Sequence, residues 1–338
     1  MYKSLRYLAI MLIVVAPAVA IGRQATDGPS PHPAPCPAPS VVIVQPNVYV
    51  ELPAQPAAPM KFDAEKRKTF ERTYKVNSSD LLNIENRYGR VHVNTWDKNE
   101  IRVKVDMIAQ AGSESKANDM LSRMRVEEVR DGKTIYLKTV YEPVRVSGPS
   151  SSEINYTIYM PADNSITLKN TYGDVYLANL KGSVNVELKY GNLKSERLTN
   201  TSNNLKLSYS NGSCSYINGG SLQVAYSNVQ VAEAKDLRGY SKYSDLMIGK
   251  LSEALNIDMK YGSFRVSDIS NKISNIRVAS TYTPISLNFA DNSAFNFDVN
   301  VQYADFKVNK DLVNITSMEK GYTSADYKGR FGTASPKA

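Results

Sequence analysis

Apolar and polar residues alternate along most of the chain after residue 60, with Gly, Asn and Ser between the alternating runs. A period of two is typical of β-strands, because successive side chains point to opposite faces of a sheet. In "LKYGNLKSERL", residues 188–198, a tyrosine and a small residue interrupt the alternation. The pattern predicts an all-β protein.

The interrupting phrase recurs along the chain. From Tyr172 to Tyr303 its tyrosines are 17 to 21 residues apart, and an outlying copy precedes them. Apolar residues precede each tyrosine in its own phase and in most copies resume three and five positions after it, as Phe264 and Val266 do after Tyr261. Each repeat therefore predicts two short strands joined by a tight corner. The repeated tyrosines are Tyr88, Tyr172, Tyr190, Tyr209, Tyr226, Tyr243, Tyr261, Tyr282 and Tyr303.

Two architectures contain such a corner. In an antiparallel hairpin the corner is a two-residue loop, which favours Asn-Gly or a leading glycine. Pairs such as Thr283-Pro284 fit this poorly. In a solenoid the corner joins two walls, and regular spacing suits a stack in which each coil pairs with its neighbours. The sequence favours a parallel β-solenoid of two-strand coils with about 18 residues per repeat. An antiparallel β-sandwich or β-meander is the alternative.

The phase of the alternation bears on the role of the tyrosines. Most share the face of Val, Leu, Ile or Met residues on their own strand, as Tyr190 does with Val186 and Leu188. This predicts rings packed in the core with hydroxyls reaching water. The other interpretation is an exposed aromatic ladder that stacks on sugar rings. The structural interpretation is favoured.

Residues 1–60 differ from the rest of the chain. Residues 1–20 have the order of a secretory signal peptide, with Lys3 and Arg6, an apolar run, and small residues before an expected cleavage after Ala20. Residues 21–60 hold ten of the sixteen prolines and predict a largely disordered linker. Within it, Val41-Val42-Ile43-Val44 is strand-like and is expected to dock on the folded part.

Four further segments follow. Residues 61–105 are expected to form an N-terminal β repeat, 106–160 an inserted helix and β-hairpin, 161–325 the solenoid repeats and 326–338 a C-terminal tail. In the insertion, Ser113 or Ser115 can cap a helix whose apolar face includes Met120 and Met124. Asp131-Gly132 predicts the hairpin turn.

Charge and cysteine content narrow the function. The formal charge is +8 and falls to +6 without Lys3 and Arg6, the two charged residues of positions 1–20. This excess favours contact with anionic envelope polymers. Nucleic acid is not expected as a partner of an exported chain, and no transmembrane segment is expected in the mature chain. Cys36 and Cys214 are too few for a disulfide framework, and both are expected to be unpaired. A bridge between Cys36 and Cys214, or a dimer linked through Cys36, is the alternative.

Few residues suit catalysis. The chain has two histidines, His32 in the linker and His92 between two valines, where it should face outward from a strand. Asp174, Asp245 and Asp305 recur two positions after a tyrosine, and Asn192, Asn211 and Asn228 occupy the same place in other copies. Asp and Asn are usual turn residues, so all six are expected to be turn residues. The sequence predicts no enzyme, no cofactor and no metal site.

The outward positions beside the tyrosines are better candidates for contact with a partner. Lys189, Lys242 and Lys260 occupy them, interrupted by uncharged residues in other copies, namely Thr171, Ser208, Ala225, Thr281 and Gln302. They are the candidate contacts for an envelope or host glycan or another anionic polymer. Another envelope protein is the alternative partner.

Several phrases together resemble a known family. "LLNIENRYGRVHVNTWDKNEIRVKV", "VRDGKTIYLK" and "INYTIYMPADNSITLKNTYGDVYL" are similar to a bacterial envelope family of β-strand-repeat proteins called "putative adhesins", a domain of unknown function. The resemblance covers about residues 70–325. It implies an exported, solenoid-like protein of the periplasm or cell surface, with no catalytic residues to transfer. The expected function is an adhesin-like binding or scaffolding surface. A polysaccharide-active enzyme, or a sensory partner of an envelope signalling system, is the alternative.

Overall fold

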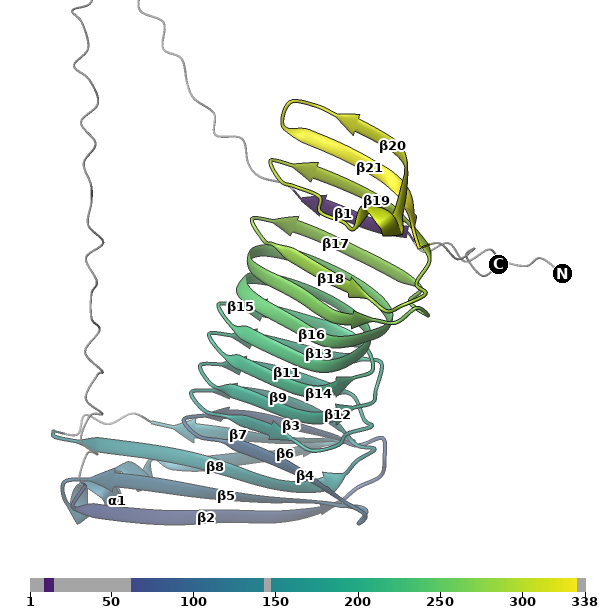
Figure 1. Ribbon diagram of the computed structural model, residues 1–338. Coiled ribbons are helices and arrows are strands. Elements are labelled where there is room, and N and C mark those ends of the chain that lie inside the picture. Colours follow the sequence, from purple (N-terminus) through teal and green to yellow (C-terminus); the bar gives the residue numbers. More distant parts are fainter. Residues whose placement is uncertain (1–8, 15–61, 143–146, 333–338) are drawn as a thin grey trace, which may run out of the picture. The chain divides into compact units, whose positions relative to one another are not determined.

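The computed structural model describes residues 62–142 and 147–332, and the backbone of the strand Ala9–Val14. Apart from that strand, the predicted leader and linker lie outside the described residues. The fold is a mostly parallel β-solenoid, as the repeat spacing predicts, and most coils give one strand to each of two walls (Figure 1). None of the helices in the described part of the chain has the length and apolar content needed to cross a bilayer.

The first wall holds the strands that precede the tyrosines. They pair in parallel, with every register matching equivalent positions of successive coils. The order is β7 (Thr134–Tyr141), β3 (Leu81–Arg87), β9 (Ser165–Thr171), β11 (Val184–Lys189), β13 (Asn203–Ser208), β15 (Gly220–Ala225), β16 (Asn228–Ile269), β17 (Asn275–Thr281), β1 (Ala9–Val14) and β19 (Phe295–Gln302).

The second wall holds the strands that follow the tyrosines. Its first two pairings are antiparallel and the rest are parallel. The long β16 contributes to both walls, because its extended pairing continues through two tyrosine corners. The order is β2 (Ala64–Lys75), β5 (Glu100–Ala111), β8 (Ser150–Pro161), β4 (Val91–Trp96), β10 (Val175–Leu177), β12 (Asn192–Leu198), β14 (Asn211–Ile217), β16 and β18 (Ile285–Phe289).

The core lies between the two walls and repeats from coil to coil. Leu168, Val186 and Leu205 are paired neighbours on the first wall, and all three are at most 1% exposed. Val175 and Leu193 occupy the matching place on the second wall. Alternation along each strand thus buries one apolar column after another, and burial of such side chains is the main favourable term in folding.

The last coil ends differently from the prediction. Residues 326–331, expected in a tail, belong to β21 (Ser324–Phe331), which pairs antiparallel with both β19 and β20 (Val313–Lys320). A short 3-10 helix, η1 (Lys310–Leu312), precedes β20. The sequence left an antiparallel sandwich or meander open as the alternative fold. Among the described residues, antiparallel pairs occur only at the two ends of the fold and in one hairpin.

That hairpin and a helix lie within residues 106–160. Ser113 caps α1 (Glu114–Ser122), and its side chain accepts a hydrogen bond from the backbone N–H of Lys116. Met124, predicted on the helix, is instead the first residue of β6 (Met124–Asp131), which pairs with β7. Gly132 has φ 53° in the turn between them. Glycine adopts this conformation without strain.

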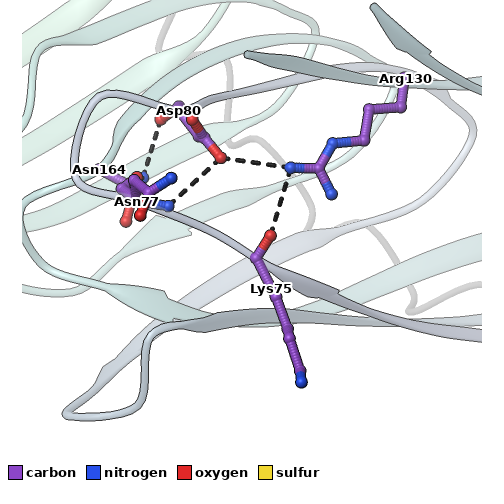
Figure 2. A network of polar contacts seen from close by, with 5 residues as sticks. All are labelled: Lys75, Asn77, Asp80, Arg130 and Asn164. Carbon is purple, nitrogen blue, oxygen red and sulfur yellow. Dashed lines mark hydrogen bonds and ion pairs between the residues drawn. The ribbon is translucent and has the colours of Figure 1, made fainter. Parts of the chain in front are cut away.

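A polar network ties this hairpin to the loop before β3 (Figure 2). The buried carboxylate of Asp80 accepts hydrogen bonds from the Asn77 N–H and from Arg130, whose guanidinium also donates to the Lys75 carbonyl. The Asn164 side chain donates to the carbonyls of Asn77 and Asp80. The loop before β3 is thus held by β6 on one side and by the next coil on the other.

A second polar chain is buried inside the first coils. Asn86 Nδ2 donates to Asn170 Oδ1 at 3.1 Å, and Thr139 Oγ1 bonds both Asn86 Oδ1 and the Tyr156 hydroxyl at 2.8 Å. Asn170 Nδ2 also donates to the carbonyls of Gly89 and Gly173. These amides satisfy corner carbonyls that no strand partner reaches, which is required of buried polar groups.

We expect Asn170→Ala to lower the free energy of unfolding by about 3 kcal/mol, because it leaves the Gly173 carbonyl without its side-chain donor and the Gly89 carbonyl with Asn86 alone. Equilibrium urea unfolding measures the change. The matched control is Asn204→Ala, which removes a partly exposed outward amide bonded to Asn185 and Ser221. This control should cost about 0.5 kcal/mol or less, as surface substitutions usually do. Equal losses for the two variants would contradict the assigned role of the buried amide.

Candidate functional site

The tyrosine corners differ from the prediction that the rings face the core. All nine repeated tyrosines have φ between 51° and 62°. This is the left-handed region, which L-residues rarely adopt. The chain therefore turns at the tyrosine itself, and the ring leaves the face set by the alternation. Tyr88 is half-buried, and the other eight rings are 39–58% exposed.

The small residue after each tyrosine has a steric reason. At Gly173 an added Cβ would overlap the Gly89 carbonyl of the neighbouring coil, and at Gly191 it would overlap that of Gly173. In the next three coils the position is serine, and the hydroxyl accepts from the preceding coil: Ser227 Oγ accepts from the Ser210 N–H at 2.9 Å. Close approach of one corner to the next explains the Tyr-Gly and Tyr-Ser phrases.

Eight of the rings form one continuous stack, which we call the tyrosine strip. It comprises Tyr88, Tyr172, Tyr190, Tyr209, Tyr226, Tyr243, Tyr261 and Tyr282. Neighbouring ring centroids are 4.7–5.4 Å apart and the ring planes are within 17° of parallel. Tyr303 has the same backbone conformation, but its N–H bonds the Thr323 carbonyl of the C-terminal hairpin.

This stacking limits what the strip can bind. A sugar between two rings needs a carbon contact of about 3.5–4.0 Å on each side, so the rings would have to be about 7–8 Å apart. Rings at the observed separation leave no such space, so sugar faces cannot enter the strip. What remains accessible is a row of ring edges and hydroxyls.

Two separate shallow hollows lie beside these ring edges, and we call the line of corners that contains both of them the groove. One hollow of about 410 Å³ is lined by three consecutive strip tyrosines together with Ser210, Asn211, Ser227 and Asn228. A second, of about 340 Å³, lies at the first coils and includes Arg90, Glu153 and Asp174. The lining of hydroxyls, amides and ring edges suits hydrogen bonding to an extended polar chain.

The far side of the groove is a ladder of exposed polar side chains. Asn192 donates from its backbone and side-chain nitrogens to Asp174 Oδ1, both at 2.8 Å, and Asn211 Nδ2 donates to Asn192 Oδ1 at 3.1 Å. From the sequence, Asn192, Asn211 and Asn228 are expected to be turn residues. In the structure each begins a strand, and their recurrence was the signal for a groove wall.

The lysines proposed from the sequence lie on the opposite side of the rings. Lys189, Lys242 and Lys260 occupy one outward column of the first wall, but Ser208 and Ala225 separate the first from the other two. Lys242 Nζ lies 5.2 Å from the Tyr243 ring centroid. Lys189 forms an ion pair with Glu187. The three lysines therefore do not form one continuous basic site.

Glu187 balances part of this basic column. Partial burial opposes ionisation, but the hydrogen bond from Lys189 and the charges of Lys206 and Lys169 lower its pKa. The carboxylate thus remains ionised between three lysines, and the net charge of the wall is smaller than its lysine count suggests.

The corner aspartates are not a catalytic pair. Asp174 and Asp245 lie in one column but four coils apart. At the usual strand spacing this is about 19 Å. Paired carboxylates of glycosidases are at most about 9.5 Å apart. Asp305 lies outside the strands, beside an apolar cavity. Within the described ranges, no three His, Cys, Asp or Glu residues are grouped closely enough to hold a metal ion.

His92 and Cys214 have structural surroundings. His92 is half-buried with its ring edge-on to Tyr176, and burial together with Arg90 lowers its pKa. Cys214 is a free thiol, and complete burial raises its pKa to about 11, although the neighbouring Ser195 opposes this. These surroundings account for both residues without a catalytic role.

We expect Tyr226→Ala to lower the free energy of unfolding by about 2 kcal/mol, since it removes two ring stacks and half-buried area. Tyr226→Gly should lose about 1 kcal/mol less, because glycine adopts a left-handed conformation freely. The φ of Tyr226 is 53°. Urea unfolding of both variants measures the contribution of ring stacking and the cost of the left-handed backbone conformation.

Tyr303→Ala is the matched control for the stack. It changes a tyrosine at φ 52° that lies outside the strip. This substitution should therefore lower the free energy of unfolding by about 1 kcal/mol or less. A loss at Tyr303 equal to that at Tyr226 would show that the corner, and not the stack, carries the stability.

Native Cys214 should react with iodoacetamide at pH 8 at least ~100-fold more slowly than in urea, since its raised pKa lowers the thiolate fraction and burial blocks access. Mass spectrometry of quenched samples gives the two rates. Similar rates would mean that the coil around Cys214 opens readily.

Several solved structures are similar to this chain. A "putative adhesin" from Bacteroides fragilis is 16% identical, with a TM-score of 0.36, and the match covers 66% of this chain and 97% of that one. A "putative adhesin" from Parabacteroides merdae is 5% identical, with a TM-score of 0.34 and coverage of 65% and 96%. A "putative lipid binding protein" from Parabacteroides distasonis is 9% identical, with a TM-score of 0.25 and coverage of 65% and 96%.

No curated protein matches the sequence. The family model described as Toastrack DUF4097, a domain of unknown function, matches residues 82–330, which is most of the chain and includes every tyrosine corner. This chain belongs to the Toastrack DUF4097 family.

Proposed function

We propose that this chain is an exported, non-enzymatic protein of the bacterial cell envelope that binds an extended polar polymer along the tyrosine strip. The observation that carries the proposal is the groove between the ring edges and the Asp174, Asn192 and Asn211 ladder. The tyrosine hydroxyls and the ladder side chains recur once in every coil. A repeated surface on stacked coils is the usual way in which repeat proteins bind extended partners.

The polymer class follows from the groups that line the groove. Hydroxyls and amides both donate and accept hydrogen bonds, as a glycan requires, and the stacked rings contribute apolar edges. Lys242 and Lys260, across the rings, add charge that favours an anionic glycan or related polymer of the envelope or a host. The site would lie in the periplasm or at the cell surface.

A glycan array probed with the chain from residue 21 should identify the polymer. The triple variant Tyr190→Phe, Tyr209→Phe and Tyr226→Phe keeps the ring stack but removes three hydroxyls, so affinity should fall at least ~10-fold with unchanged stability. Isothermal titration measures the affinity, and urea unfolding the stability. Tyr322→Phe, at a fully exposed position outside the strip, is the control and should bind as the unchanged chain does.

The same material separates the other functions. Turnover of a glycan that Asp174→Asn abolishes would indicate a polysaccharide-active enzyme. Recovery of a membrane regulator from envelope extracts, with no glycan bound, would indicate a sensory partner. Either result, or unchanged affinity of the triple variant, would overturn the proposed groove.

A further inference from the structure

One coil of the solenoid is incomplete near its C-terminal end, and we call it the open coil. β1 lies between β17 and β19 and pairs in parallel with both, so that Leu12 is in register with Val278 and Val299. β17 and β19 are therefore two strand spacings apart, about 9.6 Å. A longer repeat does not cause this gap. Tyr282 and Tyr303, on its two sides, are 21 residues apart, but Tyr261 and Tyr282 are also 21 residues apart and their rings stack at 5.2 Å.

The second wall is open at the same level. β18 pairs with β16 on one side, and residues 304–308, where the repeat predicts the next strand, form none. Between them lies an apolar cavity of about 650 Å³. Its lining includes Leu287, Phe289, Phe297, Phe306 and Val308. In the described part of the chain, one strand on each wall is thus missing from the regular stack, and β1 supplies only the first.

A second segment of the sequence has the spacing of the missing coil. In "VVIVQPNVYVEL", residues 41–52, Val41 and Ile43 precede a turn at Gln45-Pro46-Asn47, and Val48 and Val50 follow it. Ile257, Met259, Phe264 and Val266 have the same spacing around the corner at Tyr261. Proline and asparagine are common turn residues. This segment has the pattern to supply both missing strands.

The length of the chain decides which molecule provides this segment. Leu52 is joined to Ala64, the start of β2, by a dozen residue steps. These steps span at most about 43 Å. Along the second wall, the open position beyond β18 is eleven strands from β2. At the usual strand spacing this is about 53 Å. A molecule cannot place its own residues 48–52 in its own open coil.

We propose that residues 41–52 of a second copy complete the open coil, with Val41–Val44 between β17 and β19 and Val48–Leu52 beside β18. The copies then associate head to tail, because each accepts a segment at one end and offers one from the other. This inference rests on the export part of the proposed function, since removal of residues 1–20 vacates the position of β1.

The test uses the chain from residue 21 and its variants. Association is measured by sedimentation velocity over a range of concentrations, and hydrogen exchange of β17 and β19 by mass spectrometry. Val41→Asp with Ile43→Asp places charge at the positions that match buried repeat residues. It should abolish association and speed exchange in both strands at least ~10-fold.

The matched control is Val42→Asp with Val44→Asp, which adds the same charge to the alternate positions of the same segment. It should associate as the unchanged chain does. A synthetic peptide of residues 41–52 should restore slow exchange to the Val41→Asp, Ile43→Asp variant, whose accepting strands are intact.

Three results would overturn the proposal. A monomer with slow exchange in both variants would mean that β19 closes directly on β17. A monomer that loses protection only in the first variant would mean that the chain's own segment reaches the gap. Equal loss of association in both variants would mean that the contact is not a strand. Export is tested separately, by N-terminal sequencing of the protein from envelope fractions, so failure of either idea can be distinguished.

Discussion

The parallel pairing of each coil with the next is the constraint on which the rest of the structure depends. It places equivalent residues of successive coils directly above one another, about 4.8 Å apart. Many positions in the repeat then become columns of similar chemistry: apolar columns inside, a column of Asp and Asn side chains after the corner, and a ring column at the corner. In these columns a residue must fit against the equivalent residue of the next coil.

The tyrosine corner satisfies this constraint at a cost in backbone conformation. A left-handed residue with a side chain costs roughly 1–2 kcal/mol. All nine repeated tyrosines have this left-handed conformation. The cost is offset locally: the backbone N–H of Tyr172 bonds the Lys189 carbonyl of the next coil, and its ring contacts rings on both sides. Because each corner depends on its neighbours, corners stabilise one another along the stack and are not independent turns.

Repeat spacing was sufficient to predict the solenoid, because the distance between Tyr172 and Tyr190 reflects the length of one coil. It was not sufficient to place the rings. Strict alternation assigns Tyr190 to the face of Leu188, but alternation holds only while the backbone stays extended, and φ 56° at Tyr190 reverses the side chain. Nothing in one repeat distinguishes a buried ring from a stacked one; the stack exists only between coils. The groove residues were missed for the same reason, since Asn192 was judged as a turn residue within its own repeat.

The open coil shows what happens to a column when pairing is interrupted. Tyr282 and Tyr303 have the same local sequence spacing and backbone conformation as stacked pairs, but an inserted strand doubles their separation. The ring of Tyr282 therefore ends the strip with its outer face uncovered by a next tyrosine, and the cavity begins beside it. Filling the coil with a segment that has Gln45 at the corner would cover that cavity without extending the ring stack. The strip and the open coil are thus two consequences of one rule. Where the register is continuous the corner side chains form regular columns, and where it breaks β1 fills the first wall while β18 keeps an unpaired edge on the second wall.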